Sequence, residues 1–129
     1  MNQNKIHETI IEIADKYANL FRISRQDLFQ TNKYEGGKRK KTINGVSVAS
    51  MRMALGYYIS NNYPITLTNL SQLIGYCDHS TISSNNQKVY FYIKHNDPMF
   101  MSYYEPLQEI GSLYDKYNVY RTKAQVISY

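Results

Sequence analysis

Residues 67–94, LTNLSQLIGYCDHSTISSNNQKVYFYIK, decide the fold because they predict two helices joined by a short glycine turn. The first helix covers 67–74, and Thr66 supplies a capping side chain at its start. Gly75 follows its last residue, as glycine commonly does where a helix ends in a left-handed turn. Apolar residues recur at helical spacing on its expected inward face: Leu67, Leu70, Leu73 and Ile74. Two helices joined in this way are typical of a helix-turn-helix.

The second helix is expected to begin after Asp78, which can cap it, and to extend to about Lys94. Its inward face is predicted at Ile82, Asn85 and Val89, followed by Tyr92 or Ile93. Asn85 is polar where an apolar residue is expected. Either its amide bonds a neighbouring backbone group, or the helix is rotated from this assignment. Short or flexible polar side chains form the outward face: Ser83, Ser84, Gln87 and Lys88.

The first half of the chain also predicts helices. One is expected over about residues 5–20, and a shorter one follows Ser24, which has Asp27 three residues on as in a weak capping box. The first has one apolar stripe: Ile6, Ile10, Ile13, Tyr17 and Leu20. Residues 30–45 hold three glycines and little apolar content, which predicts a loop. A helix over about 47–61 follows, with its own stripe: Val48, Met51, Leu55, Tyr58 and Ile59.

Residues 97–118 predict a last helix with a break near Pro106. Apolar and aromatic residues share one of its faces: Tyr103, Leu107, Ile110, Tyr114 and Tyr117. The favoured interpretation packs this face on the rest of the domain, and the alternative is contact with a protein partner or a second copy. No segment clearly predicts a strand. The expected class is therefore all-α, with a helix-turn-helix domain over 1–95 and a C-terminal helical extension over 96–129.

The charge distribution points to a polyanion. The chain has 129 residues and a formal charge of +5, and all of the excess lies in residues 1–64. Four basic residues are consecutive in the expected loop: Lys38, Arg39, Lys40 and Lys41. A local basic patch is typical of a nucleic-acid contact, although basic loops are common and can be merely solvated.

Composition excludes several classes of protein. No apolar run approaches the ~20 residues that a membrane-spanning helix needs, and the N-terminus lacks the apolar core of a signal peptide. A single cysteine, Cys77, excludes an intramolecular disulfide and a cysteine-based zinc site. The abundance of tyrosine, isoleucine, asparagine and lysine favours an AT-rich genome, bacterial or phage. We expect a protein of the bacterial cytoplasm that contacts no membrane.

The sequence DHST suggests catalysis or metal binding, and neither interpretation holds well. Asp78 and His79 are adjacent, so on a helix they would point about 100° apart and could not form the usual carboxylate–histidine pair. As metal ligands they have no evident third partner. Ser80 would need a base within about 3 Å, and His7 and His95 lie on other expected elements. We therefore expect no enzyme, no cofactor and no metal.

Binding of DNA suits the same residues better. The first residues of the second helix of a helix-turn-helix enter the major groove, where small polar side chains meet base edges. The N–H groups at a helix start also suit a phosphate. The plainer alternative is that Asp78 is only a cap and that serine and threonine only fill the first turn.

The order of these features resembles the C-terminal DNA-binding domain of the bacterial replication initiator DnaA. The hallmark of that domain is a leucine–isoleucine–glycine helix followed by Gly-Arg-Asp-His-Ser/Thr-Thr-Val. Here LSQLIGY precedes DHSTI. IIEIADKYANLFRISRQDLF at 10–29 is similar to its opening helix and turn, and VASMRMALGYY at 48–58 to its central helix. The resemblance covers about residues 5–95, and the Asp-His-Ser-Thr motif is its specific part.

The resemblance implies a helical domain that binds short sites in double-stranded DNA. It places four residues on the motif that contacts bases and adjacent phosphates: Asp78, His79, Ser80 and Thr81. It also implies a basic loop with an arginine in the minor groove, a role that fits Arg39 or Lys41 best. The motif's usual arginine is Cys77 here, and the arginine near the start of the central helix falls at about Ala49. Arg52, one turn on, would compensate.

The chain has no Walker motif, so the resemblance implies DNA binding without the initiator's ATPase. The expected role is replication initiation or transcription control. The alternative is an interaction or virion-associated structural protein that retains the fold without the DNA role. The lost arginine and the fourteen tyrosines favour that alternative.

Overall fold

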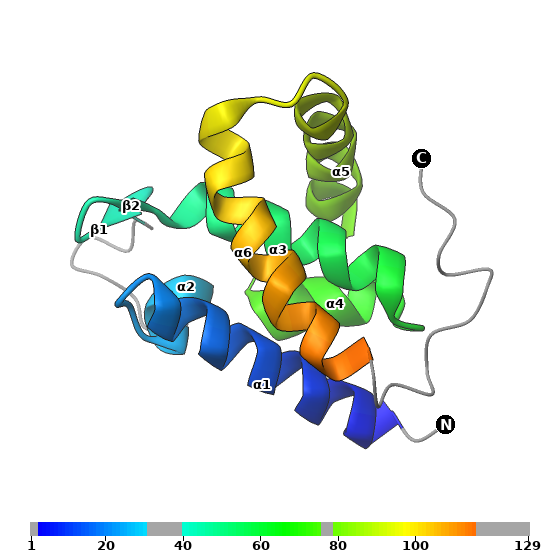
Figure 1. The fold of residues 1–129 in the computed structure, drawn as a ribbon. Helices are drawn as coiled ribbons and strands as arrows, with labels where there is room; N and C mark the ends of the chain where they lie inside the picture. Colours follow the sequence, from blue (N-terminus) through cyan, green and yellow to red (C-terminus); the bar gives the residue numbers. More distant parts are fainter. Residues whose placement is uncertain (1–2, 31–39, 76–78, 116–129) are drawn as a thin grey trace.

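A computed structural model describes residues 3–30, 40–75 and 79–115, and these residues form six helices and one short hairpin. The elements in chain order are α1 Gln3–Leu20, α2 Arg25–Phe29, β1 Thr42–Ile43, β2 Val46–Ser47, α3 Val48–Asn62, α4 Leu67–Ile74, α5 His79–Lys94 and α6 Pro98–Asp115. The all-α class is confirmed, with one small sheet added (Figure 1).

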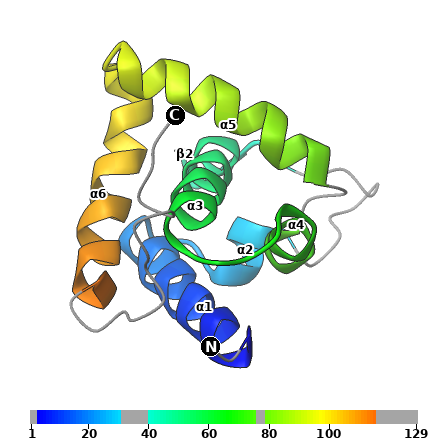
Figure 2. The same ribbon diagram turned by 90° about the vertical axis from the view of Figure 1, so that its right-hand side faces the viewer.

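Helix α3 lies at the centre of the molecule. It contacts α2, α4, α5 and α6, while α1 packs against α2 and α6. Figure 2 looks nearly along α3 and shows the other helices arranged around it. Most of its residues are buried, including Gly56 and the adjacent Tyr57 and Tyr58. The sequence predicted a single buried stripe, but a helix surrounded by neighbours buries most of its circumference.

Helix α1 confirms the predicted stripe with one exception. Ile6, Ile10, Ile13 and Tyr17 are fully buried, whereas Leu20 is 57% exposed. Leu20 is the last residue of the helix, and the chain turns away immediately afterwards through Arg22, which has a φ of 62°. The prediction that Leu20 belongs to the core was therefore wrong.

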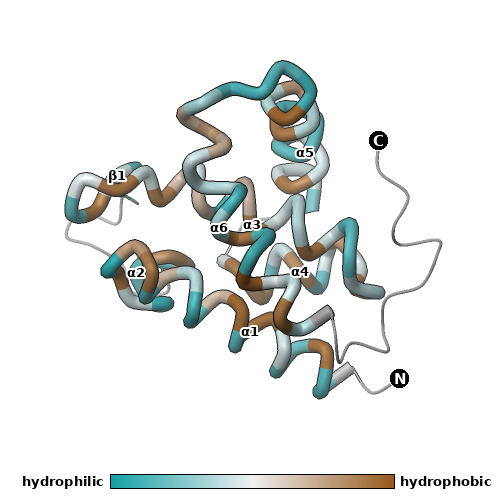
Figure 3. The backbone as a smooth tube through the Cα atoms, in the orientation of Figure 1, coloured by the Kyte–Doolittle hydropathy of each residue, from teal (hydrophilic) through white to brown (hydrophobic). Residues whose placement is uncertain are grey.

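The connections are capped as their residues predict. The Ser24 hydroxyl accepts from the Asp27 N–H at 2.9 Å, and the Thr66 hydroxyl accepts from the Asn69 N–H at 3.1 Å. Gly75 ends α4 with a φ of 86°, a conformation that favours glycine. Figure 3 shows that hydrophilic and hydrophobic positions alternate along the helices and that the α5–α6 connection is hydrophilic.

The hairpin β1–β2 corrects the expectation that the chain has no strand. Thr42 pairs with Ser47 and Ile43 with Val46 in antiparallel register. The turn between them is Asn44-Gly45, and both residues have positive φ. Asn-Gly between two apolar residues is a strong hairpin signal, because both turn positions of the favoured two-residue hairpin need positive φ.

Helix α5 confirms the predicted bounds but not the predicted rotation. Its buried residues are Ile82, Asn86 and Val89, whereas Asn85 is half-buried. The helix is thus rotated from the expected assignment. Residues 76–78, which include Cys77 and Asp78, lie outside the described part of the chain.

Helix α6 is one helix and passes through Pro106, so the predicted break was wrong. Phe100, Tyr104 and Leu107 are buried on both sides of the proline, and this packing holds the helix together despite the lost N–H. The Tyr17 hydroxyl also donates to the Tyr103 carbonyl at 2.6 Å. Helix α6 thus packs against α1 and α3, as the favoured interpretation predicted. Tyr117, the last residue of the predicted face, lies outside the described residues.

Candidate nucleic-acid interface

The outer face of α5 gathers most of the polar residues that the sequence singled out. Thr81 is half-buried. The other six are exposed: His79, Ser80, Ser83, Ser84, Gln87 and Lys88. The six residues form three neighbouring pairs, each four residues after the last. Because successive helical residues lie 100° apart, this spacing places all six on one half of the helix. We call this set of six exposed residues the outer face of α5. The buried residues named above lie on the opposite side.

The start of α5 favours an anion. Its sixteen residues include no aspartate or glutamate, and the N–H groups of the first turn carry the positive end of the helix dipole. His79 and Ser80 are both exposed in this turn. A phosphate could therefore approach it without meeting a carboxylate from α5. Asp78, which would precede them, lies outside the described residues.

Arg52 lies in a different environment from the one that sequence reasoning assigned to it. Its side chain is 7% exposed, and Nη2 donates to the carbonyl oxygens of Gly75 at 3.0 Å and Ile74 at 3.5 Å. These are end carbonyls of α4, which lack partners within their own helix. Arg52 therefore caps α4 and ties the end of α4 to α3. This placement differs from the expectation that Arg52 contacts DNA.

We call the four consecutive basic residues Lys38–Lys41 the basic segment. The backbone at its end is held by Gln30, which the sequence did not point to. The side-chain amide of Gln30 accepts from the Lys40 N–H at 2.8 Å and donates to the Lys40 carbonyl. The Lys41 carbonyl accepts from the Val48 N–H at 2.9 Å. The backbone is thus held while the side chains of Lys40 and Lys41 are exposed. Nothing in the sequence around Gln30 distinguishes it from an ordinary polar loop residue.

These contacts bring the two candidate regions to the same helix. The backbone of Lys41 bonds the first residue of α3, and Gly75, which ends α4, bonds Arg52 in the second turn of α3. Lys38 and Arg39 lie outside the described residues. Lys41, at the described end of the basic segment, and Gly75, at the end of α4, are therefore both attached to the N-terminal half of α3.

The potential metal ligands of the described residues are dispersed over several elements. Within residues 3–30, 40–75 and 79–115, no three histidine, cysteine or acidic side chains gather as metal ligands. His7 is on α1, His79 begins α5 and His95 follows α5. Over the same ranges, no helix is long and apolar enough to cross a membrane.

Comparisons with protein-family models, curated proteins and solved structures gave no match.

Proposed function

We propose that this chain binds double-stranded DNA sequence-specifically, with α4 and α5 as a helix-turn-helix and α5 as the reading helix. The outer face of α5 is the observation that carries the proposal. It begins at the helix start and presents hydroxyl, amide, imidazole and ammonium groups. Side chains of these kinds bond base edges and phosphates in the major groove.

The exposed lysines support a second contact. Lys40 and Lys41 end the basic segment on a backbone that Gln30 holds in place. A fixed backbone with exposed ammonium groups suits phosphate binding, which adds affinity for every duplex but no sequence information. The proposed role is that of a DnaA-like DNA-binding domain acting in replication or transcription without its own ATPase, in a bacterium or its phage.

Selection of bound sequences from a random duplex library tests this proposal. The wild-type chain should enrich one short motif, and the double variant Asp78→Ala, His79→Ala should lose that enrichment. Ser112→Ala is the matched control, because Ser112 is an exposed helical serine on α6, distant in sequence from α5. The control should enrich the wild-type motif.

Two results would contradict the proposal. Enrichment of the same motif by the double variant would remove the reading role from the start of α5. Failure of the wild-type chain to bind any duplex at low salt would favour the alternative, an interaction or virion-associated protein that uses this fold for protein contacts.

A further inference from the structure

An open groove lies against the C-terminal half of α5. Its volume is about 470 Å³, and four residues of α5 line it: Gln87, Lys88, Phe91 and Tyr92. Two of them are aromatic, one carries an ammonium group and one a carboxamide. Gln87 and Lys88 also belong to the outer face of α5. The groove therefore continues the outer face of α5 towards the end of the helix.

Phe91 presents its ring to solvent at this groove. The residue is 58% exposed, whereas Ile82 and Val89 of the same helix are buried. The ring lies against that of His95, with the centroids 4.1 Å apart and the planes tilted by 59°. A single exposed apolar residue is ordinary on a protein surface, so the groups beside Phe91 decide what it can bind.

The charges around Phe91 favour an anion. Among the described residues between 40 and 96, none is an aspartate or a glutamate. Lys88 lies one turn before Phe91 and is exposed. The next acidic residue, Asp97, is half-buried, and its Oδ1 accepts from the Phe100 N–H at 2.9 Å. An anion in the groove therefore meets Lys88 without a carboxylate from α5.

An aromatic ring beside an ammonium group suits an unpaired nucleotide. A base of any identity can stack on the ring, while the ammonium group binds the phosphate. Side chains three and four residues apart on a helix are neighbours, so Lys88 adjoins both Phe91 and Tyr92. One nucleotide, whose base and phosphate are joined through a single sugar, can meet both kinds of group. A duplex suits the ring less well, because its bases are already stacked on one another.

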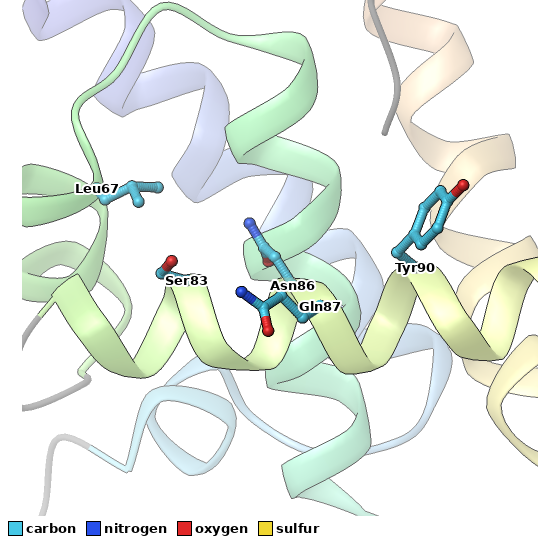
Figure 4. A pocket seen from close by; sticks show the side chains of 5 residues that line it. All are labelled: Leu67, Ser83, Asn86, Gln87 and Tyr90. Atoms are coloured by element: carbon cyan, nitrogen blue, oxygen red, sulfur yellow. The ribbon is translucent and has the colours of Figure 1, made fainter.

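A smaller cavity adjoins the groove. Its volume is about 260 Å³, and Figure 4 shows the residues that line it: Leu67, Ser83, Asn86, Gln87 and Tyr90. Gln87 lines both hollows. None of the five side chains carries a full charge, so the cavity offers no counter-ion to a phosphate. Signals of Leu67 and Ser83 therefore report on the cavity alone, and those of Lys88 and Phe91 on the groove.

We propose that the groove binds single-stranded nucleic acid, with one base stacked on Phe91 and a phosphate bound by Lys88. This activity goes beyond the duplex binding proposed above and does not depend on it. Stacking on the ring is insensitive to the identity of the base, so the groove adds affinity for unpaired strands without reading their sequence.

Fluorescence anisotropy with a labelled oligothymidylate at low salt tests the proposal. An abasic oligomer of the same length is the matched control, because it keeps the phosphates and lacks the bases. The wild-type chain should bind the oligothymidylate about 5- to 150-fold more tightly, the range expected for one stacked base. Oligodeoxyuridylate and oligouridylate differ only in the 2′-hydroxyl group, and the tighter of the two identifies DNA or RNA as the source.

Variants of Phe91 separate stacking from other contacts. Phe91→Ala should abolish the preference for the oligothymidylate and leave the abasic oligomer bound as before. Phe91→Leu keeps an apolar side chain without a ring and should lose most of that preference, whereas Phe91→Trp should keep it. Leu113→Ala is the matched control, because Leu113 is a 51% exposed apolar residue on α6, and it should bind like the wild type. Lys88→Gln should weaken both ligands and lower the slope of log affinity against log salt by about 0.7.

Three results would overturn the inference. One is the absence of binding to any single strand at low salt. Another is wild-type affinity of Phe91→Ala or Phe91→Leu for the oligothymidylate, because stacking on the ring would then contribute nothing. The third is a set of ¹⁵N NMR shifts confined to Leu67 and Ser83, which would move the ligand to the cavity.

The duplex selection described above keeps this inference separate from the proposed function. Phe91→Ala should still enrich the wild-type duplex motif, because Phe91 is not part of the outer face of α5. A wild-type chain that binds single strands through Phe91 but enriches no duplex motif would contradict the proposed function and support the groove. A chain that enriches a duplex motif but binds no single strand would do the reverse.

Discussion

The outer face of α5 and Arg52 show how differently one fold uses polar residues that look alike in sequence. The residues of the outer face are exposed, whereas Arg52 lies against the end of α4 and is 7% exposed. Both belonged to one predicted DNA surface. Arg52 instead bonds the carbonyls of Ile74 and Gly75 at the end of α4, and so joins α4 to α3.

The difference is one of burial. A guanidinium in a buried place needs acceptors, and the end of a helix offers carbonyls that lack partners. Lys88 needs no acceptor from the protein, because it is exposed to solvent on α5. Arg52 is therefore expected to act on stability and on the position of the reading helix, and the outer face of α5 on recognition.

The largest expected effect follows replacement of Arg52. Arg52→Ala should lower the free energy of unfolding by about 2–4 kcal/mol, because it removes both a charge-assisted hydrogen bond and the packing of the buried stem. Arg52→Met keeps much of the stem and should lower it by about half as much. Urea unfolding of the three proteins measures both values.

The matched control is Arg25→Ala. Arg25 pairs with Asp15 at 3.1 Å, but the two side chains are 31% and 48% exposed. Exposed pairs contribute little, so the decrease in unfolding free energy should stay below about 1 kcal/mol. If Arg52→Met kept wild-type stability but bound DNA more weakly, Arg52 would contact DNA after all.

Replacements on the outer face of α5 should have the opposite profile. His79→Ala and Gln87→Ala should reduce discrimination between the preferred site and a mismatched one by about 1–3 kcal/mol for each base-specific hydrogen-bonded pair that is removed. The free energy of unfolding should change by less than about 0.5 kcal/mol, as is usual for exposed positions. Competition binding with matched and mismatched duplexes measures the discrimination. Equal weakening on both duplexes would reduce these residues to phosphate binding.

Most helices were predictable because their local signals agree. Thr66 and Gly75 mark both ends of α4, and the apolar stripe of α1 fixes its inward face. The hairpin was also predictable from Asn44-Gly45, but the low apolar content around it favoured a loop. Two strands of two residues each give little pattern to detect.

The remaining errors depend on packing between elements. In α5, the spacing from Ile82 to Val89 allows either Asn85 or Asn86 to face inward, because three and four residues both approximate one turn. The hydrogen bond to Ser60 on α3 shows that Asn86 is the inward residue. Pro106 likewise stays helical because the residues around it pack on α1 and α3. Local sequence does not contain these interactions.

The buried tyrosines allow a test of the core that leaves the outer face of α5 unchanged. Burial raises the pKa of Tyr17 well above its ordinary value of 10.0, and the neighbouring Tyr103 adds to the effect. Burial raises the pKa of Tyr104 likewise, with contributions from Tyr57 and Tyr58. Above pH 10 the unfolded chain loses these protons while the folded chain keeps them, so stability should fall as the pH rises.

The expected slope is about 1.4 kcal/mol per pH unit for each such tyrosine above pH 10. Tyr17→Phe should remove its share of the slope, although it also removes the hydrogen bond to the Tyr103 carbonyl. Urea unfolding at several alkaline pH values measures the slope. An unchanged slope in Tyr17→Phe would show that another group titrates on unfolding.

The smallest expected effect separates affinity from recognition within the DNA surface itself. Lys40→Gln and Lys41→Gln should each weaken binding to every duplex alike, because ammonium–phosphate attraction does not depend on sequence. Each lysine removed should reduce the slope of log affinity against log salt by about 0.9, and His79→Ala should leave that slope nearly unchanged.

Gln30→Ala keeps both lysines and removes the amide that holds the Lys40 backbone. If the position of the lysines matters, Gln30→Ala should weaken binding as well. If only their charge matters, it should bind like the wild type, and the basic segment would act as a diffuse positive field instead of a fixed phosphate site.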